Sequence, residues 1–274
     1  MRGAREVTAF ALLPVVLLAI VFLPPWVYLA MVWVIAMFSA WELLALFRRL
    51  GQPAPQVPTL VTLGALLPAL WLGGLPRAGA VLALALLVVP IAYLLGRYPI
   101  QGAAAGIAGA TFTVVYFVVT GGAMGFLRTL FPGTMGVKVL LFHCLLIWGG
   151  DSGAYYVGSR FGRHKLAPVV SPKKSWEGIA GGVLGTFFGL WFCRTLFFPE
   201  LPLPLGLAIA TALSVLAPVG DLVESLFKRD AGVKDSSDLL PGHGGFLDRS
   251  DSLFFAAPFV LALFILVGLF GVPA

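Results

Sequence analysis

Nine apolar runs occupy most of the chain, and short breaks rich in Pro, Gly and charged residues separate them. A run of about 20 apolar residues is what an α-helix needs to cross the hydrocarbon core of a bilayer. The pattern therefore predicts an all-α, polytopic integral membrane protein with about nine transmembrane helices. The predicted spans are residues 7–24, 26–47, 57–75, 78–96, 103–127, 136–157, 176–198, 203–220 and 252–272.

Composition excludes the soluble classes of protein. Hydrophobic residues make up 59% of the chain and charged residues 11%, whereas a soluble domain carries roughly 25% charged residues. A soluble globular protein and a disordered chain are excluded on this ground. The net charge of +6 would suit a nucleic-acid partner, but on so apolar a chain it indicates membrane topology, and we expect no nucleic-acid binding.

The placement of Lys and Arg predicts the side of the membrane that each loop faces, because basic residues are retained in the cytoplasm. With a cytoplasmic N-terminus, fourteen of the eighteen basic residues fall in cytoplasmic segments. This topology places both polar stretches, 158–175 and 221–251, on the cytoplasmic face. We expect a multi-pass protein of the cell membrane whose active site faces the cytoplasm.

Acidic residues are concentrated in the second half of the chain. Ten of the twelve acids lie between Asp151 and Asp251, together with ten basic residues, so this window carries no net charge. The sequence therefore predicts a membrane-anchoring scaffold over residues 1–135 and a region that carries the catalytic site over residues 136–274.

Two pairs of acids have a spacing that brings carboxylates together. Asp221 and Glu224 are three residues apart, as are Asp248 and Asp251, so each pair shares one face if its segment is helical. Such carboxylates repel one another unless a cation lies between them, and Mg²⁺ often bridges protein carboxylates to substrate phosphates. The simpler alternative is a hydrated loop with compensating ion pairs. Four basic residues would surround the phosphates: Lys228, Arg229, Lys234 and Arg249.

Two earlier segments are candidates for substrate binding. Asp151 lies inside a predicted span, where a charge is costly and usually functional, although pairing with a base such as Lys165 would also explain it. Ser171 precedes a proline, as a helix cap often does, and a helix N-terminus beside Lys173 and Lys174 could bind a phosphate. The alternative for these lysines is a topological anchor before the next span.

The second half of the chain contains two motifs, each with its residues in a fixed sequence order. The earlier one reads Asp151-Ser-Gly-Ala-Tyr155, then Ser171-Pro-Lys-Lys-Ser-Trp-Glu-Gly178. The later one reads Ser225-Leu-Phe-Lys-Arg229, Lys234-Asp235, then His243-Gly244-Gly245-Phe-Leu-Asp-Arg-Ser-Asp251. Over roughly residues 140–255 the chain resembles the phosphatidate cytidylyltransferases, also called CDP-diacylglycerol synthases. Ser250 departs from the family pattern, which more often has an apolar residue or Thr there.

The resemblance implies an integral membrane nucleotidyltransferase that joins CTP to phosphatidic acid, giving CDP-diacylglycerol and pyrophosphate for phospholipid biosynthesis. It implies dependence on Mg²⁺, with a second or monovalent cation as an open alternative, a homodimer, and contact with the lipids of a bacterial inner membrane. Since the attacking phosphate is already ionised at neutral pH, His243 is interpreted as an orienting residue and not as a base.

Residue roles follow from the matching positions. Asp221 and Asp248 are the leading metal ligands, and Glu224 and Asp251 support them. The residues expected to act in catalysis are Asp221, Lys228, Arg229, Asp248 and Arg249. Those expected to bind substrate are Asp151, Ser171, Lys173, Lys174, Lys234, Asp235, His243, Gly244 and Gly245.

Other functions fit the sequence less well. A CTP-dependent polyprenol or dolichol kinase is the nearest alternative, because it also holds a cytidine triphosphate beside a lipid. A transporter would have interrupted helices in two corresponding halves, whereas here the polar residues gather in one half. The tetrapeptide 150–153 is too short to indicate a serine protease, and the motif of the CDP-alcohol transferases is missing from the sequence.

Overall fold

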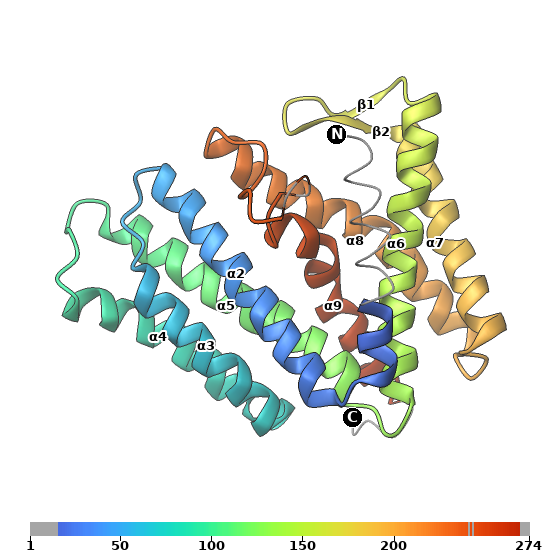
Figure 1. The fold of residues 1–274 in the computed structure, drawn as a ribbon, viewed down its shortest axis with the longest axis horizontal. Coiled ribbons are helices and arrows are strands. Elements are labelled where there is room, and N and C mark those ends of the chain that lie inside the picture. Colours follow the sequence, from blue (N-terminus) through green and yellow to red (C-terminus); the bar gives the residue numbers. More distant parts are fainter. Residues whose placement is uncertain (1–15, 241, 243, 269–274) are drawn as a thin grey trace. The chain divides into compact units, whose positions relative to one another are not determined.

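The computed structural model describes residues 16–240, 242 and 244–268, and nearly all of its elements are helices (Figure 1). Residues 16–22 are helical. The elements that follow are α2 (Pro25–Arg49), α3 (Gln56–Gly73), the short 3-10 helix η1 (Leu75–Arg77), α4 (Ala78–Leu95), α5 (Ala103–Thr129), α6 (Met135–Phe161), β1 (Lys165–Ala167), β2 (Ser171–Ser175), α7 (Trp176–Leu196), α8 (Leu203–Asp230) and α9 (Leu247–Val267).

Eight helices of the described part of the chain are long and apolar enough to cross a membrane. This confirms the predicted class, an all-α protein with several membrane spans. Half of the first predicted span, residues 7–15 of 7–24, lies outside the described residues, so the total of nine spans stays a prediction.

Two predicted boundaries were wrong, and both lie where a polar segment continues a helix. Helix α8 runs ten residues beyond the predicted end of its span, to Asp230, and α9 begins at Leu247 instead of residue 252. Apolar runs cannot reveal these turns, because their polar side chains are stabilised by partners elsewhere in the fold. The acids Asp221 and Glu224 of α8 and Asp248 and Asp251 of α9 are therefore all held on helices.

The chain packs as two compact units. One comprises the residues up to Phe126 together with Phe227–Ser250, and the other comprises Leu127–Leu226 together with the residues from Asp251 onward. Helices α8 and α9 each contribute to both units. The division by role, scaffold over 1–135 and catalysis over 136–274, stays a prediction, because packing does not test it.

The first unit is built around one face of α2. Its side chains at Val32, Ala36 and Leu43 are at most 2% exposed, and their spacing of four and seven residues places them on one side of the helix. At the end of α2, the ring of Phe47 meets that of Phe227 edge to face at 5.9 Å. The end of α8 is thereby packed against α2 within this unit.

The second unit is built around the pair α6 and α7, whose backbones touch through glycines. A Cβ added to Gly149 would lie 2.8 Å from the carbonyl oxygen of Gly185, and one added to Gly181 would lie 2.6 Å from that of Gly153. Small residues allow this close approach, which is how helices commonly associate in a bilayer. The polar turns of α6 are thus fixed against α7.

A two-stranded antiparallel hairpin joins these helices, and it corrects one prediction. Ser171 lies in β2, where it pairs with Ala167, and does not cap a helix. The cap of α7 is Ser175, whose hydroxyl accepts a hydrogen bond from the backbone N–H of Gly178 at 3.1 Å. The prediction failed because strand pairing keeps residues 171–175 extended, so the helix begins four residues later.

Candidate functional site

Three acids of the second unit converge on one point. Asp221 and Glu224 of α8 and Asp251 of α9 each offer a carboxylate oxygen, and these oxygens lie within 4.8 Å of one another. Beside them, the hydroxyl of Ser252 donates a hydrogen bond to the carbonyl of Ala217 at 3.0 Å and so joins the two helices. The prediction that Asp221 and Glu224 share a helix face is confirmed, and Asp251 joins the same group.

The chemistry of this group suits a divalent cation. Glu224 is buried, and Asp221 and Asp251 are half-buried, so mutual repulsion is poorly screened by water. Carboxylate oxygens from two rigid helices are the ligands that hard divalent cations prefer. The residues present therefore fit a metal ion.

Lys174 brings a positive charge to this acidic group from the hairpin. Its Nζ lies 2.8 Å from Oδ2 of Asp221 and donates a hydrogen bond to the carbonyl of Pro218 at 3.1 Å. Lys173 is exposed, as expected because successive side chains of a strand point to opposite faces. Of the two lysines that the sequence predicts for phosphate binding, only Lys174 contacts the acids.

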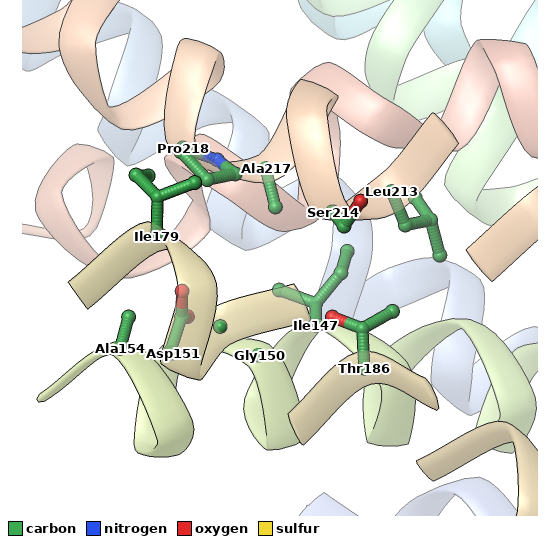
Figure 2. Close-up of a pocket in the computed structure, with 11 residues that line it drawn as sticks. Ile147, Gly150, Asp151, Ala154, Ile179, Thr186, Leu213, Ser214, Ala217 and Pro218 are labelled. Atoms are coloured by element: carbon green, nitrogen blue, oxygen red, sulfur yellow. The ribbon is translucent and has the colours of Figure 1, made fainter. Parts of the chain in front are cut away.

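Asp151 lines a cavity between α6, α7 and α8 in the same unit (Figure 2). The hydroxyls of Thr186 and Ser214 also line this cavity, and the remaining lining is apolar or glycine. Pro218 borders the cavity as well, and its carbonyl accepts the hydrogen bond from Lys174. A substrate role for Asp151 stays a prediction.

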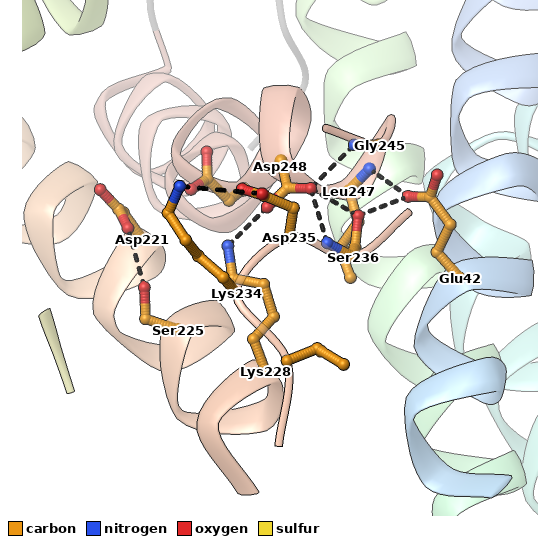
Figure 3. A network of polar contacts seen from close by, with 12 residues as sticks. Glu42, Asp221, Ser225, Lys228, Lys234, Asp235, Ser236, Gly245, Leu247 and Asp248 are labelled. Atoms are coloured by element: carbon orange, nitrogen blue, oxygen red, sulfur yellow. Dashed lines mark hydrogen bonds and ion pairs between the residues drawn. The ribbon is translucent and has the colours of Figure 1, made fainter. Parts of the chain in front are cut away.

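The first unit holds a second polar network, centred on Asp248 (Figure 3). Lys228 donates to its Oδ1 at 2.5 Å. The backbone N–H and the hydroxyl of Ser236 donate to its Oδ2 at 2.8 and 2.7 Å, and the backbone N–H of Gly245 at 2.8 Å. Four protein donor groups thus lie within hydrogen-bonding distance of the Asp248 carboxylate, and the leading metal-ligand role predicted for it stays a prediction.

Glu42 of α2 is a member of this network that sequence reasoning missed. Its side chain is 0% exposed, and its carboxylate accepts hydrogen bonds from the hydroxyls of Ser236 and Ser237. A signal was available, since Glu42 is an acid inside a predicted span, where an ionisable group is by default a candidate functional residue.

The glycines of the later motif allow the backbone to approach these carboxylates closely. Gly244 has a φ of +75°, and a Cβ there would lie 2.6 Å from Oδ2 of Asp248. The expected close approach therefore occurs toward the protein's own acid, and a substrate-binding role for Gly244 and Gly245 stays a prediction. His243 lies outside the described residues.

The other predicted basic residues lie at the surface. Arg229 and Arg249 are exposed, and Arg229 donates a hydrogen bond to the carbonyl of Val233 at 3.0 Å. Lys234 lies 3.9 Å from Asp235, with side chains 67% and 50% exposed. These cations are accessible to a charged ligand.

Comparisons with known proteins identify the family. The family model described as "Cytidylyltransferase family" matches residues 3–267. A phosphatidate cytidylyltransferase of Pseudomonas aeruginosa is 38% identical over 289 aligned positions that cover all of both chains. Proteins of the same name from Haemophilus influenzae and Bacillus subtilis are 46% and 48% identical, but the matches cover only 44% and 49% of their lengths and 45% and 47% of this chain. The chain belongs to the cytidylyltransferase family.

Proposed function

We propose that this protein is a membrane-embedded nucleotidyltransferase that joins CTP to phosphatidic acid, giving CDP-diacylglycerol and pyrophosphate. The observation that carries the proposal is the full-length match to the Pseudomonas aeruginosa phosphatidate cytidylyltransferase. The acidic group of α8 and α9 supports it, because phosphoryl chemistry of this kind relies on charge neutralisation.

The reaction needs no proton transfer at neutral pH. A phosphate oxygen of phosphatidic acid attacks the α-phosphorus of CTP, the bond from that phosphorus to the bridging oxygen breaks, and pyrophosphate leaves. Both reactants are anions, so alignment and charge neutralisation dominate the barrier. The protein must therefore supply positive charge to both phosphates and hold them in line.

Asp221, Glu224 and Asp251 are the residues of the second unit that would hold Mg²⁺, and the family position of Asp248 also suits a metal ligand. Bound Mg²⁺ would neutralise charge on the triphosphate. Lys174, paired with Asp221 at 2.8 Å, is suited to contact phosphate oxygens beside these acids.

Surface cations complete the proposed site. Arg229, Lys234 and Arg249 are exposed and would bind the triphosphate and the lipid phosphate, together with Lys228. Arginine binds phosphate with two parallel N–H donors and lysine with a point charge. Their number suits a substrate pair with several negative charges.

The setting of the enzyme is part of the proposal. We place it in the cell membrane with a cytoplasmic N-terminus and a cytoplasmic active site, because fourteen of the eighteen basic residues then fall on the cytoplasmic side. The homodimer expected from the family is also a proposal, tested by the mass of the purified protein in detergent.

Differently labelled CTP tests the function. Purified protein is given phosphatidic acid, Mg²⁺ and CTP labelled at either the α- or the γ-phosphate. We expect the α-label in CDP-diacylglycerol and the γ-label in pyrophosphate. A lipid kinase would instead move the γ-label into a polyprenol or dolichol and leave CDP. If neither label reaches a lipid, the proposed function is wrong.

A further inference from the structure

Glu42 carries a buried charge in a helix that is long and apolar enough to span a membrane. It lies in α2 with no exposed surface, where an uncompensated carboxylate is strongly unfavourable. Four donor groups lie within hydrogen-bonding distance of its carboxylate and compensate it. The donors are the hydroxyls of Ser236 (3.0 Å) and Ser237 (2.6 Å) and the backbone N–H groups of Phe246 (3.1 Å) and Leu247 (2.7 Å).

Two of these donors lie at the start of α9, since Phe246 immediately precedes the helix and Leu247 is its first residue. The first N–H groups of a helix have no partner within it and carry partial positive charge. Glu42 satisfies the N–H groups of Phe246 and Leu247 from a different helix. It therefore fixes the first turn of α9, which contains Asp248.

Ser236 connects Glu42 directly to Asp248 (Figure 3). Its hydroxyl oxygen lies 2.7 Å from Oδ2 of Asp248 and 3.0 Å from Oε2 of Glu42. One hydroxyl carries one proton, so two carboxylates compete for it. Gly245 packs directly against this network, because a Cβ there would collide with Ser236 and Glu42.

We propose that Glu42 is a positioning residue for the Lys228–Asp248 pair. Through Ser236 and the first turn of α9, it sets the position and hydrogen bonding of the Asp248 carboxylate that Lys228 contacts. The kinetic part of this inference rests on the proposed function, since it assumes that Lys228 and Asp248 take part in cytidylyl transfer.

Two neighbouring serines provide a matched test. The hydroxyls of Ser236 and Ser237 both lie within hydrogen-bonding distance of Glu42, but of the two serines only Ser236 also contacts Asp248. If Glu42 acts through Asp248, Ser236→Ala lowers kcat about tenfold, the effect of losing a charge-assisted hydrogen bond. Ser237→Ala leaves kcat close to wild type, and Ser236→Thr, which keeps the hydroxyl, restores it. All rates are normalised to the folded protein.

Glu42→Gln and Ser236→Ala together form a double-mutant cycle. We expect a loss of kcat of about tenfold or more, and Glu42→Gln/Ser236→Ala should lose no more than the more impaired single variant, because both act on Asp248. Equal losses in Ser236→Ala and Ser237→Ala, or multiplying losses in the double variant, would show that Glu42 is only a structural cap.

Hydrogen exchange separates this inference from the proposed function. The backbone N–H groups of Ser236 and Gly245 donate to Asp248, so Glu42→Gln should speed their exchange while α6 stays protected. If they remain protected, Glu42 does not position Asp248, whatever reaction the enzyme catalyses. If the wild-type protein transfers no cytidylyl group, the proposed function fails and the exchange rates alone decide the role of Glu42.

Discussion

Lys228 donates a hydrogen bond to Asp248 over 2.5 Å, and their side chains are only 9% and 4% exposed. The two residues belong to the end of α8 and the first turn of α9, twenty residues apart in sequence. Burial makes each charge dependent on the other, because neither can be stabilised by bulk water. The pair therefore links the stability of this region to the charges that the proposed reaction uses.

Asp248→Asn should reveal both the contribution of Asp248 to stability and its contribution to turnover. Leaving the Lys228 ammonium buried without its counter-charge costs about 3–5 kcal/mol, so the melting temperature falls. Turnover should be lost at every Mg²⁺ concentration, because Asp248 also belongs to the proposed site. Thermal unfolding in detergent and the labelled CTP assay measure both effects.

The double variant Lys228→Met/Asp248→Asn is the control for stability. Replacing a buried ion pair by groups without charge is often neutral, so we expect most of the lost melting temperature to return without any return of activity. Normal turnover in Asp248→Asn would remove Asp248 from the proposed site.

Asp251→Asn should weaken the affinity of the acidic group for the metal ion. It removes the charge of one of three carboxylates whose oxygens lie within 4.8 Å, so the Mg²⁺ concentration for half-maximal turnover should rise about tenfold or more. Asp230→Asn is the matched control, since Asp230 is an exposed acid at the end of α8 and is not a member of the group. An equal shift in both variants would indicate a general charge effect.

Lys174→Met should change the metal dependence in the opposite direction. Lys174 lies 2.8 Å from Asp221, where its charge competes with a bound cation. Removing it should lower the Mg²⁺ concentration for half-maximal turnover while lowering the maximal rate, because a phosphate contact is lost. Lys173→Met should do neither, since Lys173 is exposed on the opposite face of β2. A higher Mg²⁺ requirement in Lys174→Met would contradict this role.

The sequence predicts those features of the fold and site that depend on residue spacing within a single helix. The apolar runs locate α2 to α9 to within a few residues at most ends, and the interval between Asp221 and Glu224 places them on one helix face. The role of Glu42 could not be predicted in this way, because its donors lie about 200 residues later in the chain. Ser171 was misjudged for a related reason, since its extended conformation depends on pairing with Ala167.

Glycine substitutions test whether backbone contact between α6 and α7 holds the second unit together. An added Cβ at Gly181 would lie 2.5 Å from the Cβ of Val157 and 2.6 Å from the carbonyl oxygen of Gly153, so Gly181→Ala should destabilise the protein by about 1–3 kcal/mol. Gly79→Ala is the control, because Gly79 is also helical but has nothing within 4 Å of an added Cβ. Alanine is the better helix former, so that variant should be neutral or slightly more stable. Equal melting temperatures for the two variants would mean that α6 and α7 can separate without loss, and that the glycines are not what fixes Asp151.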